Sequence, residues 1–313
     1  MATKEATLDA AVAAGVSLRR TRHRYGEALV KSSLAVCALI SIITTVGIVV
    51  SLLLPAIDFF RAVNPVDYIT GKNWAPLCEP ASFGVLPLIV GTFSVTFWAL
   101  VVAVPFGLGT AVYLSEYARP ATRDKLKPVL EILAGIPTVV YGYFALVAVT
   151  PILRAIGVQV DIFNALAAGL VMGIMLIPTV ASLSEDAMSA VPQALRDGAY
   201  GLGADRLQVA TRVVIPAATS GIIASFVLAI SRAVGETMIV LIAAGQLPQL
   251  TFDPRRTIET LTAFIGATGN GDLPTGSIEY KTIFAVGLTL FAMTLVMNVI
   301  SIRLVRKYRE VYD

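Results

Sequence analysis

Apolar residues gather in six long runs that polar segments separate. The runs cover residues 32–57, 86–114, 129–153, 162–183, 217–244 and 282–304. At a rise of about 1.5 Å per residue, a helix needs about 20 such residues to cross about 30 Å of hydrocarbon. The pattern therefore predicts six membrane-spanning helices. Pro137 and Pro151 interrupt the third run, which a membrane helix tolerates when neighbouring groups satisfy the freed carbonyls.

The composition agrees with a protein that has lipid as its solvent. Of the 313 residues, 56% are hydrophobic and 14% are charged, and the mean hydropathy is +0.78. Soluble domains are about one quarter charged. The first apolar run exceeds the roughly 7–15 residues of a signal-peptide core and lacks a small-x-small cleavage site, so we expect it to stay as a span. The predicted fold class is an all-α integral membrane protein with six transmembrane helices.

The placement of basic residues predicts the orientation of the chain. If the N-terminus is cytoplasmic, seventeen of the 24 lysines and arginines fall in cytoplasmic segments and six fall outside, with Arg232 inside a span. This is the bias of the positive-inside rule. We therefore predict a multi-pass protein of the plasma (inner) membrane with both termini cytoplasmic. The expected parts are a tail (1–31), the first span (32–57), a transmembrane domain (86–304) and a second tail (305–313).

The side chains that carry metal or nucleotide chemistry are scarce. Cys37 lies in an apolar run, Cys78 lies in a loop and His23 is the only histidine, so neither a disulfide nor a Cys/His zinc site is expected. The chain also lacks the Gly-x-x-x-x-Gly-Lys-Ser/Thr loop that cradles nucleotide phosphates. We expect no catalytic residues, metal or bound cofactor in this chain. Nothing supports binding to nucleic acid, whereas the basic tail could contact anionic membrane lipid.

Residues 184–216 form a long polar segment, which is unusual for a structureless loop in a compact domain. Two short helices are predicted around 192–202 and 204–213, because proline suits a first helical turn and Gly203 suits a break. In the second helix, i, i+3, i+4 spacing places four apolar residues on one face: Leu207, Ala210, Val213 and Val214. This face could lie on the membrane or dock on another protein, and an ordinary amphipathic loop helix is the simpler alternative.

This segment resembles a signature of the membrane subunits of binding-protein-dependent importers. Their pattern is Glu-Ala-Ala, three residues, Gly, nine residues, then Ile-x-Leu-Pro. Here Asp197-Gly198-Ala199 stands three residues before Gly203, and nine further residues precede Val-Val-Ile-Pro216. The spacing matches, although Gly198 in place of alanine weakens its helix by about 1 kcal/mol. The resemblance implies that Asp197, Gly198, Ala199, Gly203 and Pro216 couple the chain to a separate ATPase, which would use the ATP and Mg.

A charged pair is predicted inside the fifth run. Arg232 lies near its middle, where a charge costs about 2.5–3.5 kcal/mol on insertion scales. Glu236 follows four residues later, so in one continuous helix the two would share a face. They could form an ion pair that holds helices together. Alternatively, they could line an anion path with the hydroxyls of Ser231 and Thr237, because an arginine fork binds phosphate oxygens in pairs.

Three segments resemble the permeases of phosphate-specific importers. They are Arg-Ala-Val-Gly-Glu-Thr at 232–237, Glu-Ile-Leu-Ala-Gly-Ile-Pro-Thr-Val-Val-Tyr-Gly at 131–142 and Gly-Asp-Leu-Pro-Thr-Gly-Ser-Ile-Glu-Tyr at 271–280. The continuation at 237–240, Thr-Met-Ile-Val, is more similar to the PstC type of subunit than to the PstA type. The resemblance runs from about residue 86 to the C-terminus. It implies an ABC importer permease core of the MetI-like kind that imports inorganic phosphate by alternating access.

The same resemblance implies a set of partners. They are a second, homologous permease subunit of the PstA type, an ATPase dimer of the PstB type and a phosphate-binding protein of the PstS type. A permease of this class for another oxyanion or solute remains an alternative, as does an ion-coupled secondary carrier, although neither inverted repeats nor broken-helix sites are visible. A membrane enzyme is the weakest alternative, because the runs contain no metal cluster or nucleophile–base set.

Overall fold

The computed structural model describes residues 25–271 and 273–307, without the side chains of residues 25, 26, 28 and 304–307. The predicted basic cluster from Arg19 to Arg24, with His23, lies outside the described residues, as does the end of the C-terminal tail. The chain divides into two units, residues 1–51 and 52–313. The described part of the first unit belongs to α2 (Tyr25–Ala62), and nearly all the apolar side chains of α2 up to residue 51 are exposed, as a helix in hydrocarbon allows.

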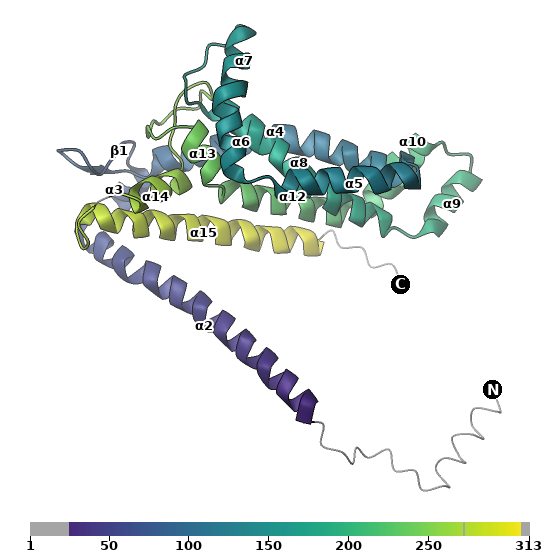
Figure 1. The fold of residues 1–313 in the computed structure, drawn as a ribbon, viewed down its shortest axis with the longest axis horizontal. Coiled ribbons are helices and arrows are strands. Elements are labelled where there is room, and N and C mark those ends of the chain that lie inside the picture. The colour runs from purple at the N-terminus through teal and green to yellow at the C-terminus, as the bar shows by residue number, and fades with distance from the viewer. Residues whose placement is uncertain (1–24, 272, 308–313) are drawn as a thin grey trace. The chain divides into compact units, whose positions relative to one another are not determined.

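Helices make up most of the second unit, which Figure 1 shows as a ribbon. After α2 the elements are α3 (Pro65–Thr70), β1 (Trp74–Ala75), β2 (Ser82–Phe83), α4 (Leu86–Val112), α5 (Pro120–Gly135), α6 (Thr138–Phe144), α7 (Thr150–Ala155), α8 (Ala165–Ser189), α9 (Gln193–Gly201), α10 (Arg206–Val209), α11 (Ile215–Ala217), α12 (Thr219–Val234), α13 (Met238–Ala243), α14 (Leu261–Gly269) and α15 (Ile278–Lys307). Three π-helical segments join them: η1 (Tyr113–Tyr117), η2 (Ala145–Val149) and η3 (Ala210–Val214). The strands β1 and β2 pair antiparallel, with Trp74 opposite Phe83.

The core of this unit is the close contact between α4 and α8. A Cβ atom built at Gly173 would lie 2.6 Å from the Cβ of Val102 and 2.7 Å from the carbonyl oxygen of Ala99. At Gly169 it would lie 2.7 Å from the Cβ of Trp98. The Gly-x-x-x-Gly spacing thus puts both glycines against one neighbour, and small residues let membrane helices approach closely. Other helices of the unit pack against this pair: α12 contacts both α4 and α8, and α5 contacts α8.

Gly173→Leu is expected to destabilise the protein strongly. The added side chain has no space against α4, so the helices must separate, at a cost of about 2 kcal/mol or more. Gly109→Leu on α4 is the matched control, because nothing lies within 4 Å of a Cβ built there. Thermal unfolding of the detergent-solubilised protein should show a lower Tm for the first variant and a native Tm for the second. Equal Tm values for both would contradict the packing argument.

The third predicted span is shorter than its apolar run. Helix α5 ends at Gly135 and α6 begins at Thr138, and Ile136 and Pro137 between them are extended. Proline disfavours helical backbone in the preceding residue, which explains the break. The helix that can cross a membrane is therefore Thr138–Ala155, with 18 residues, and residues 129–135 belong to α5 instead.

The fifth predicted span is also not one helix. Residues 206–217 and 219–234 meet at a bend of 72°, and a second break follows before α13. Within the described residues, five helices are long and apolar enough to span a membrane, or six if the bent pair is one span. Pro216 lies beside the first break and Gly235 lies at the second, and both residue types weaken a continuing helix. The expectation of one helix over 217–244 was wrong.

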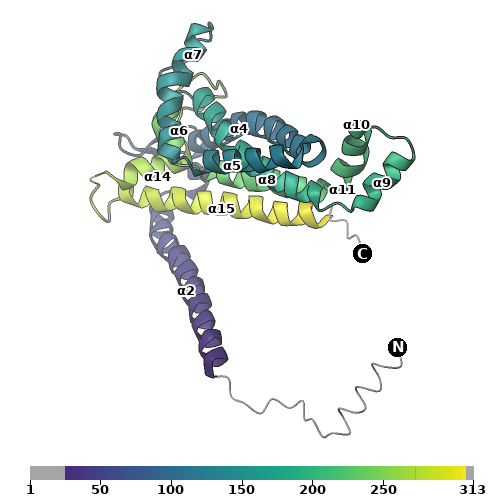
Figure 2. The same cartoon turned by 45° about the vertical axis from the view of Figure 1, so that its right-hand side comes forward.

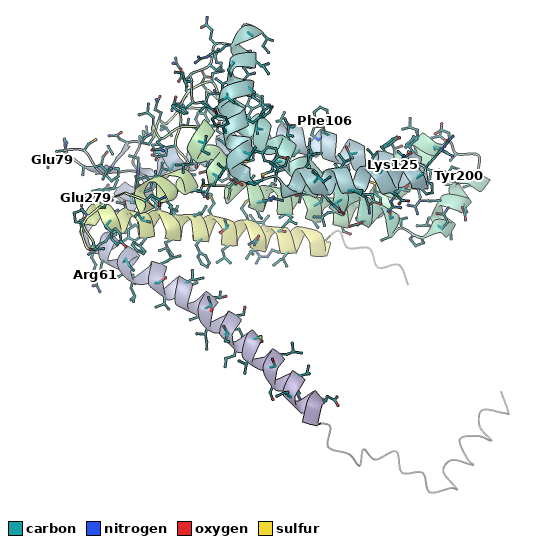
Figure 3. The ribbon with its side chains drawn as sticks, viewed as in Figure 1. Arg61, Glu79, Phe106, Lys125, Tyr200 and Glu279 are labelled. Carbon is teal, nitrogen blue, oxygen red and sulfur yellow. The ribbon has the colours of Figure 1, made fainter. Side chains whose placement is uncertain are left out.

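The second unit has two chemically different ends. Helices α9 and α10 lie at one end, and β1, α3 and α14 lie at the other, in both views of the ribbon (Figures 1 and 2). With side chains drawn, Lys125 and Tyr200 mark the α9 end, and Glu79 and Glu279 mark the α14 end (Figure 3). Any site at one end is therefore well separated from a site at the other.

Candidate functional site

At the α9 end, two short helices form an elbow, which we define as residues 193–214. Helix α9 ends at Gly201, and Gly203 has a φ of +85°, which side-chain-bearing residues rarely adopt. Helix α10 begins at a capping box, because Asp205 accepts from the Gln208 backbone N–H at 2.7 Å and the Gln208 side chain accepts from the Asp205 backbone N–H at 3.1 Å. The prediction of two short helices separated at Gly203 is confirmed.

A buried arginine attaches the elbow to the membrane helices. Arg196 is 9% exposed, and its guanidinium donates to the carbonyl oxygens of Val191 at 2.6 Å and Met188 at 2.8 Å. It also forms an ion pair with Glu116 at 3.0 Å. A pair of this kind resists separation, because removing one partner leaves a buried charge uncompensated. Sequence reasoning counted Arg196 only as a topology signal and missed this role, since Glu116 is 80 residues away.

Four signature residues belong to the elbow, and the fifth, Pro216, lies just beyond it in α11. Asp197, Gly198, Gly203 and Pro216 are exposed and Ala199 is half-buried. Leu202 at the tip is 91% exposed. The predicted apolar face needs a correction, because Leu207 is 61% exposed whereas Val209 is buried. The π-helical turn η3 changes the angular spacing along this helix, so a strict α-helical period misassigns its buried face.

Arg232 lies in the last turn of α12 with an exposed side chain. Its Nη1 donates to the hydroxyl of Thr179 on α8 at 3.1 Å. The guanidinium therefore links α12 to α8, and most of its N–H donors make no hydrogen bond to a described residue.

Glu236 does not pair with Arg232, which corrects the predicted pair on one helix face. Helix α12 ends at Val234, and the Glu236 carboxylate accepts instead from the backbone N–H groups of Thr237, Met238 and Ile239 at 3.1, 2.9 and 3.3 Å. These groups begin α13, where a negative charge is favourable. The break at Gly235 places the carboxylate at the start of the next helix, and no ion pair joins these two described residues.

The two hydroxyls of the predicted path also separate. The Ser231 hydroxyl donates to Asn298 Oδ1 on α15 at 3.3 Å, and these two residues line a cavity of about 460 Å³. The Thr237 hydroxyl donates to the carbonyl oxygen of Gly235 at 3.4 Å. The structure thus brings Arg232 to Thr179 and Ser231 to Asn298, and it leaves Thr237 in the break between helices.

Thr179, which accepts the hydrogen bond from Arg232, lines a second cavity of about 530 Å³. We call it the Thr179 cavity. Its polar lining includes Thr179, Ser182, Lys127 and Glu131. Glu131, which sequence analysis placed at the edge of the third span, lies on α5 instead. An anion that leaves Arg232 could meet hydroxyls and then an ammonium group along this lining.

Lys127, which lines this cavity, is paired with a buried carboxylate. Glu185 on α8 is fully buried and pairs with Arg123 and, at 2.6 Å, with Lys127, both on α5. Lys127 also approaches Asp186 at 3.5 Å. The hydrogen bond to Glu185 raises the pKa of Lys127. Sequence reasoning missed this network, because Arg123 and Glu185 are 62 residues apart and both seemed ordinary loop charges.

Known proteins resemble this chain in sequence and in fold. The YqgH protein of Bacillus subtilis (strain 168), a probable ABC transporter permease, is 34% identical over 294 residues, which cover 93% of this chain and 94% of that protein. The phosphate transport system permease protein PstC of Haemophilus influenzae is 29% identical over 309 residues, covering 91% and 94%. In the crystal structure of a bacterial alginate ABC transporter with a pentasaccharide-bound periplasmic protein, one chain has a TM-score of 0.64 at 14% identity, covering 90% of this chain and 96% of that one, which supports the fold.

A family model also matches most of the chain. Residues 103–310 match the binding-protein-dependent transport system inner membrane component, and this range contains the elbow, Arg232 and the Thr179 cavity. Importers of this family work with ATPase and binding-protein partners. Since the match spans more than half of the chain, the protein belongs to the family of binding-protein-dependent transport system inner membrane components.

Proposed function

We propose that this chain is the PstC-type permease subunit of an ATP-driven importer of inorganic phosphate. The observation that carries the proposal is Arg232 on α12, an exposed guanidinium that donates to Thr179 on α8 and makes no other hydrogen bond within the part of the chain that the structure describes. The likeness to PstC of Haemophilus influenzae over 91% of the chain supports the same substrate. Phosphate oxygens match the planar fork of an arginine, and the nearby Glu236 carboxylate is engaged by backbone N–H groups at the start of α13.

The path would run from Arg232 into the Thr179 cavity. Thr179 and Ser182 offer hydroxyls and Lys127 offers an ammonium group, and all three line that cavity. Glu236 is engaged by three backbone N–H groups, so its charge is partly neutralised where an anion would pass. The network of Glu185 with Arg123 and Lys127 would then close or open the exit, because Lys127 belongs to both the cavity and the network.

The α9 end would face the cytoplasm and receive the power stroke. The elbow carries the signature spacing, presents Leu202 to the outside and is attached to the membrane helices by Arg196. ATP and Mg would be bound by a PstB-type ATPase dimer. A PstA-type subunit would complete the path, and a PstS-type phosphate-binding protein would dock at the α14 end.

Reconstitution of the complex tests this function. We expect phosphate-loaded binding protein to stimulate ATP hydrolysis and to drive uptake of labelled phosphate into proteoliposomes. An excess of sulfate or molybdate should not reduce this uptake. If only another oxyanion stimulates ATP hydrolysis, phosphate is rejected as the substrate, but the chain is still a subunit of an ATP-driven importer. Uphill uptake without ATP, driven by an ion gradient, would instead support a secondary carrier and reject the proposal.

A further inference from the structure

The α14 end contains a cavity that the transport path does not use. Its volume is about 540 Å³, and it lies between the β1–β2 segment and α14; we call it the Trp74 cavity. Most of the side chains that line it are apolar. Its polar members include Trp74, Glu259, Asn73 and Gln246. None of the described lining residues is a lysine or an arginine.

Trp74 brings an unsatisfied donor to this cavity. Its side chain is 2% exposed, and its Nε1–H has no hydrogen-bond partner among the described residues. The ring is held in place by edge contacts with Phe264 on α14 and Tyr68 on α3, at centroid distances of 5.0 and 6.2 Å. A buried indole usually finds an acceptor, because an unmade hydrogen bond costs about 1–3 kcal/mol.

Glu259 brings an unsatisfied acid to the same cavity. The residue is 6% exposed, and its carboxylate makes no hydrogen bond or ion pair with a described residue. Its backbone is fixed, since a Cβ built at Gly91 on α4 would lie 2.3 Å from the carbonyl oxygen of Glu259. Burial raises the pKa of Glu259 to about 7. The fold therefore holds an acid in a place that disfavours its charge, and a nearby cation would reverse that effect.

The cavity does not suit a small metal cation. Hard cations take about six or more oxygen ligands, and the lining offers one carboxylate among mainly apolar groups. A long basic side chain fits better, because lysine and arginine lay their aliphatic stems on apolar surface and extend only the head to a polar group. Leu77, Pro248 and Phe264 would contact the stem, and Glu259 would meet the head.

We propose that the Trp74 cavity receives a lysine or arginine side chain of the solute-binding protein when that protein docks on the permease. The carboxylate of Glu259 would pair with the basic head group, and the aliphatic stem would lie against the apolar side chains that line the cavity beside the Trp74 ring. The inference rests on the proposed function in one respect, that the α14 end faces the binding protein. It does not depend on phosphate as the cargo.

A docking measurement on the intact complex tests the proposed pairing of Glu259 with a basic side chain of the binding protein. The affinity of purified binding protein for the complex in nanodiscs is compared among native, Glu259→Gln, Trp74→Phe and Glu79→Gln proteins. We expect the Kd to rise about tenfold for Glu259→Gln and severalfold for Trp74→Phe. Glu79→Gln is the matched control, because Glu79 is an exposed carboxylate on the same end and its Kd should stay native (Figure 3).

A second measurement reads the cavity directly. Cys78 lines it, and both cysteines of the chain are free, so Cys37→Ser leaves one thiol to label. Bound binding protein should slow maleimide labelling of Cys78, and Glu259→Gln should remove that protection. The Tm of Glu259→Gln should not fall below native, since the variant replaces an unpaired buried acid, and this checks that the complex still folds.

Several outcomes would overturn the proposal. A native Kd for Glu259→Gln would do so, and so would an equal loss for Glu79→Gln, which would indicate general charge attraction. Protection of Cys78 by phosphatidylethanolamine nanodiscs alone would assign the cavity to a lipid head group. If docking depends on Glu259 but the complex imports another oxyanion, phosphate is rejected and this inference stands.

Discussion

Arg232→Gln is expected to reduce ATP-dependent phosphate uptake by about a hundredfold or more. Glutamine keeps a donor for Thr179, which Arg232 contacts at 3.1 Å, but it removes the charge and the two-pronged fork. Two charge-assisted hydrogen bonds are worth about 1.5–3 kcal/mol each, and about 1.4 kcal/mol is a factor of ten. Initial rates of labelled phosphate uptake into proteoliposomes measure the effect, with the ATPase content of each preparation checked.

Two variants separate the anion path from a structural role. Arg232→Lys keeps the charge and loses the fork, so partial uptake is expected. Arg61→Gln removes an exposed arginine that pairs with Asp58 at 3.2 Å, away from the path, and native uptake is expected. Normal uptake by Arg232→Gln would reject the path, and Arg232 would then only join α12 to α8 through Thr179.

Leu202→Asp is expected to detach the ATPase from the permease. Leu202 is 91% exposed at the tip of the elbow, so its side chain buries very little apolar surface against its own chain. Burying it on a partner would contribute about 1.5–3 kcal/mol, and an unpaired buried carboxylate would cost several more. We expect ATPase co-purification to fall more than about tenfold and uptake to disappear with it.

The control for this variant keeps an apolar side chain at the same place. Leu202→Met has a similar volume, so it should retain the ATPase and most of the uptake. Because Leu202 touches little of its own chain, neither variant should change the Tm of the isolated permease. An ATPase that remains attached to Leu202→Asp and still drives uptake would show that coupling does not pass through the tip of the elbow.

Much of the secondary structure could be predicted from local pattern. Runs of apolar residues locate the membrane helices because the need to satisfy backbone hydrogen bonds in lipid leaves few alternatives to a helix. Gly203, with a φ of +85°, could be predicted as the break in the elbow because few other residues accept that backbone. The signature spacing from Asp197 to Pro216 likewise needs only local sequence.

The candidate site could be predicted only in part. Arg232 was identified because a charge in an apolar run is costly, and its place between helices agrees with that signal. The position of Glu236 cannot be predicted in the same way, because four-residue spacing puts it beside Arg232 only in an unbroken helix and the chain breaks at Gly235. Whether a glycine bends a helix depends on the packing around it, and the residues of the helix do not contain that information.

The sequence by itself determined that this is a membrane protein, which runs of the chain are apolar and which segment resembles a coupling element, since each depends on residues close together in the chain. The tertiary structure decided the pairs: Arg196 with Glu116, Glu185 with Arg123 and Lys127, and Trp74 with Glu259 in one cavity. Such pairs form because distant helices pack side by side, and close contacts such as that between α4 and α8 choose which helices those are.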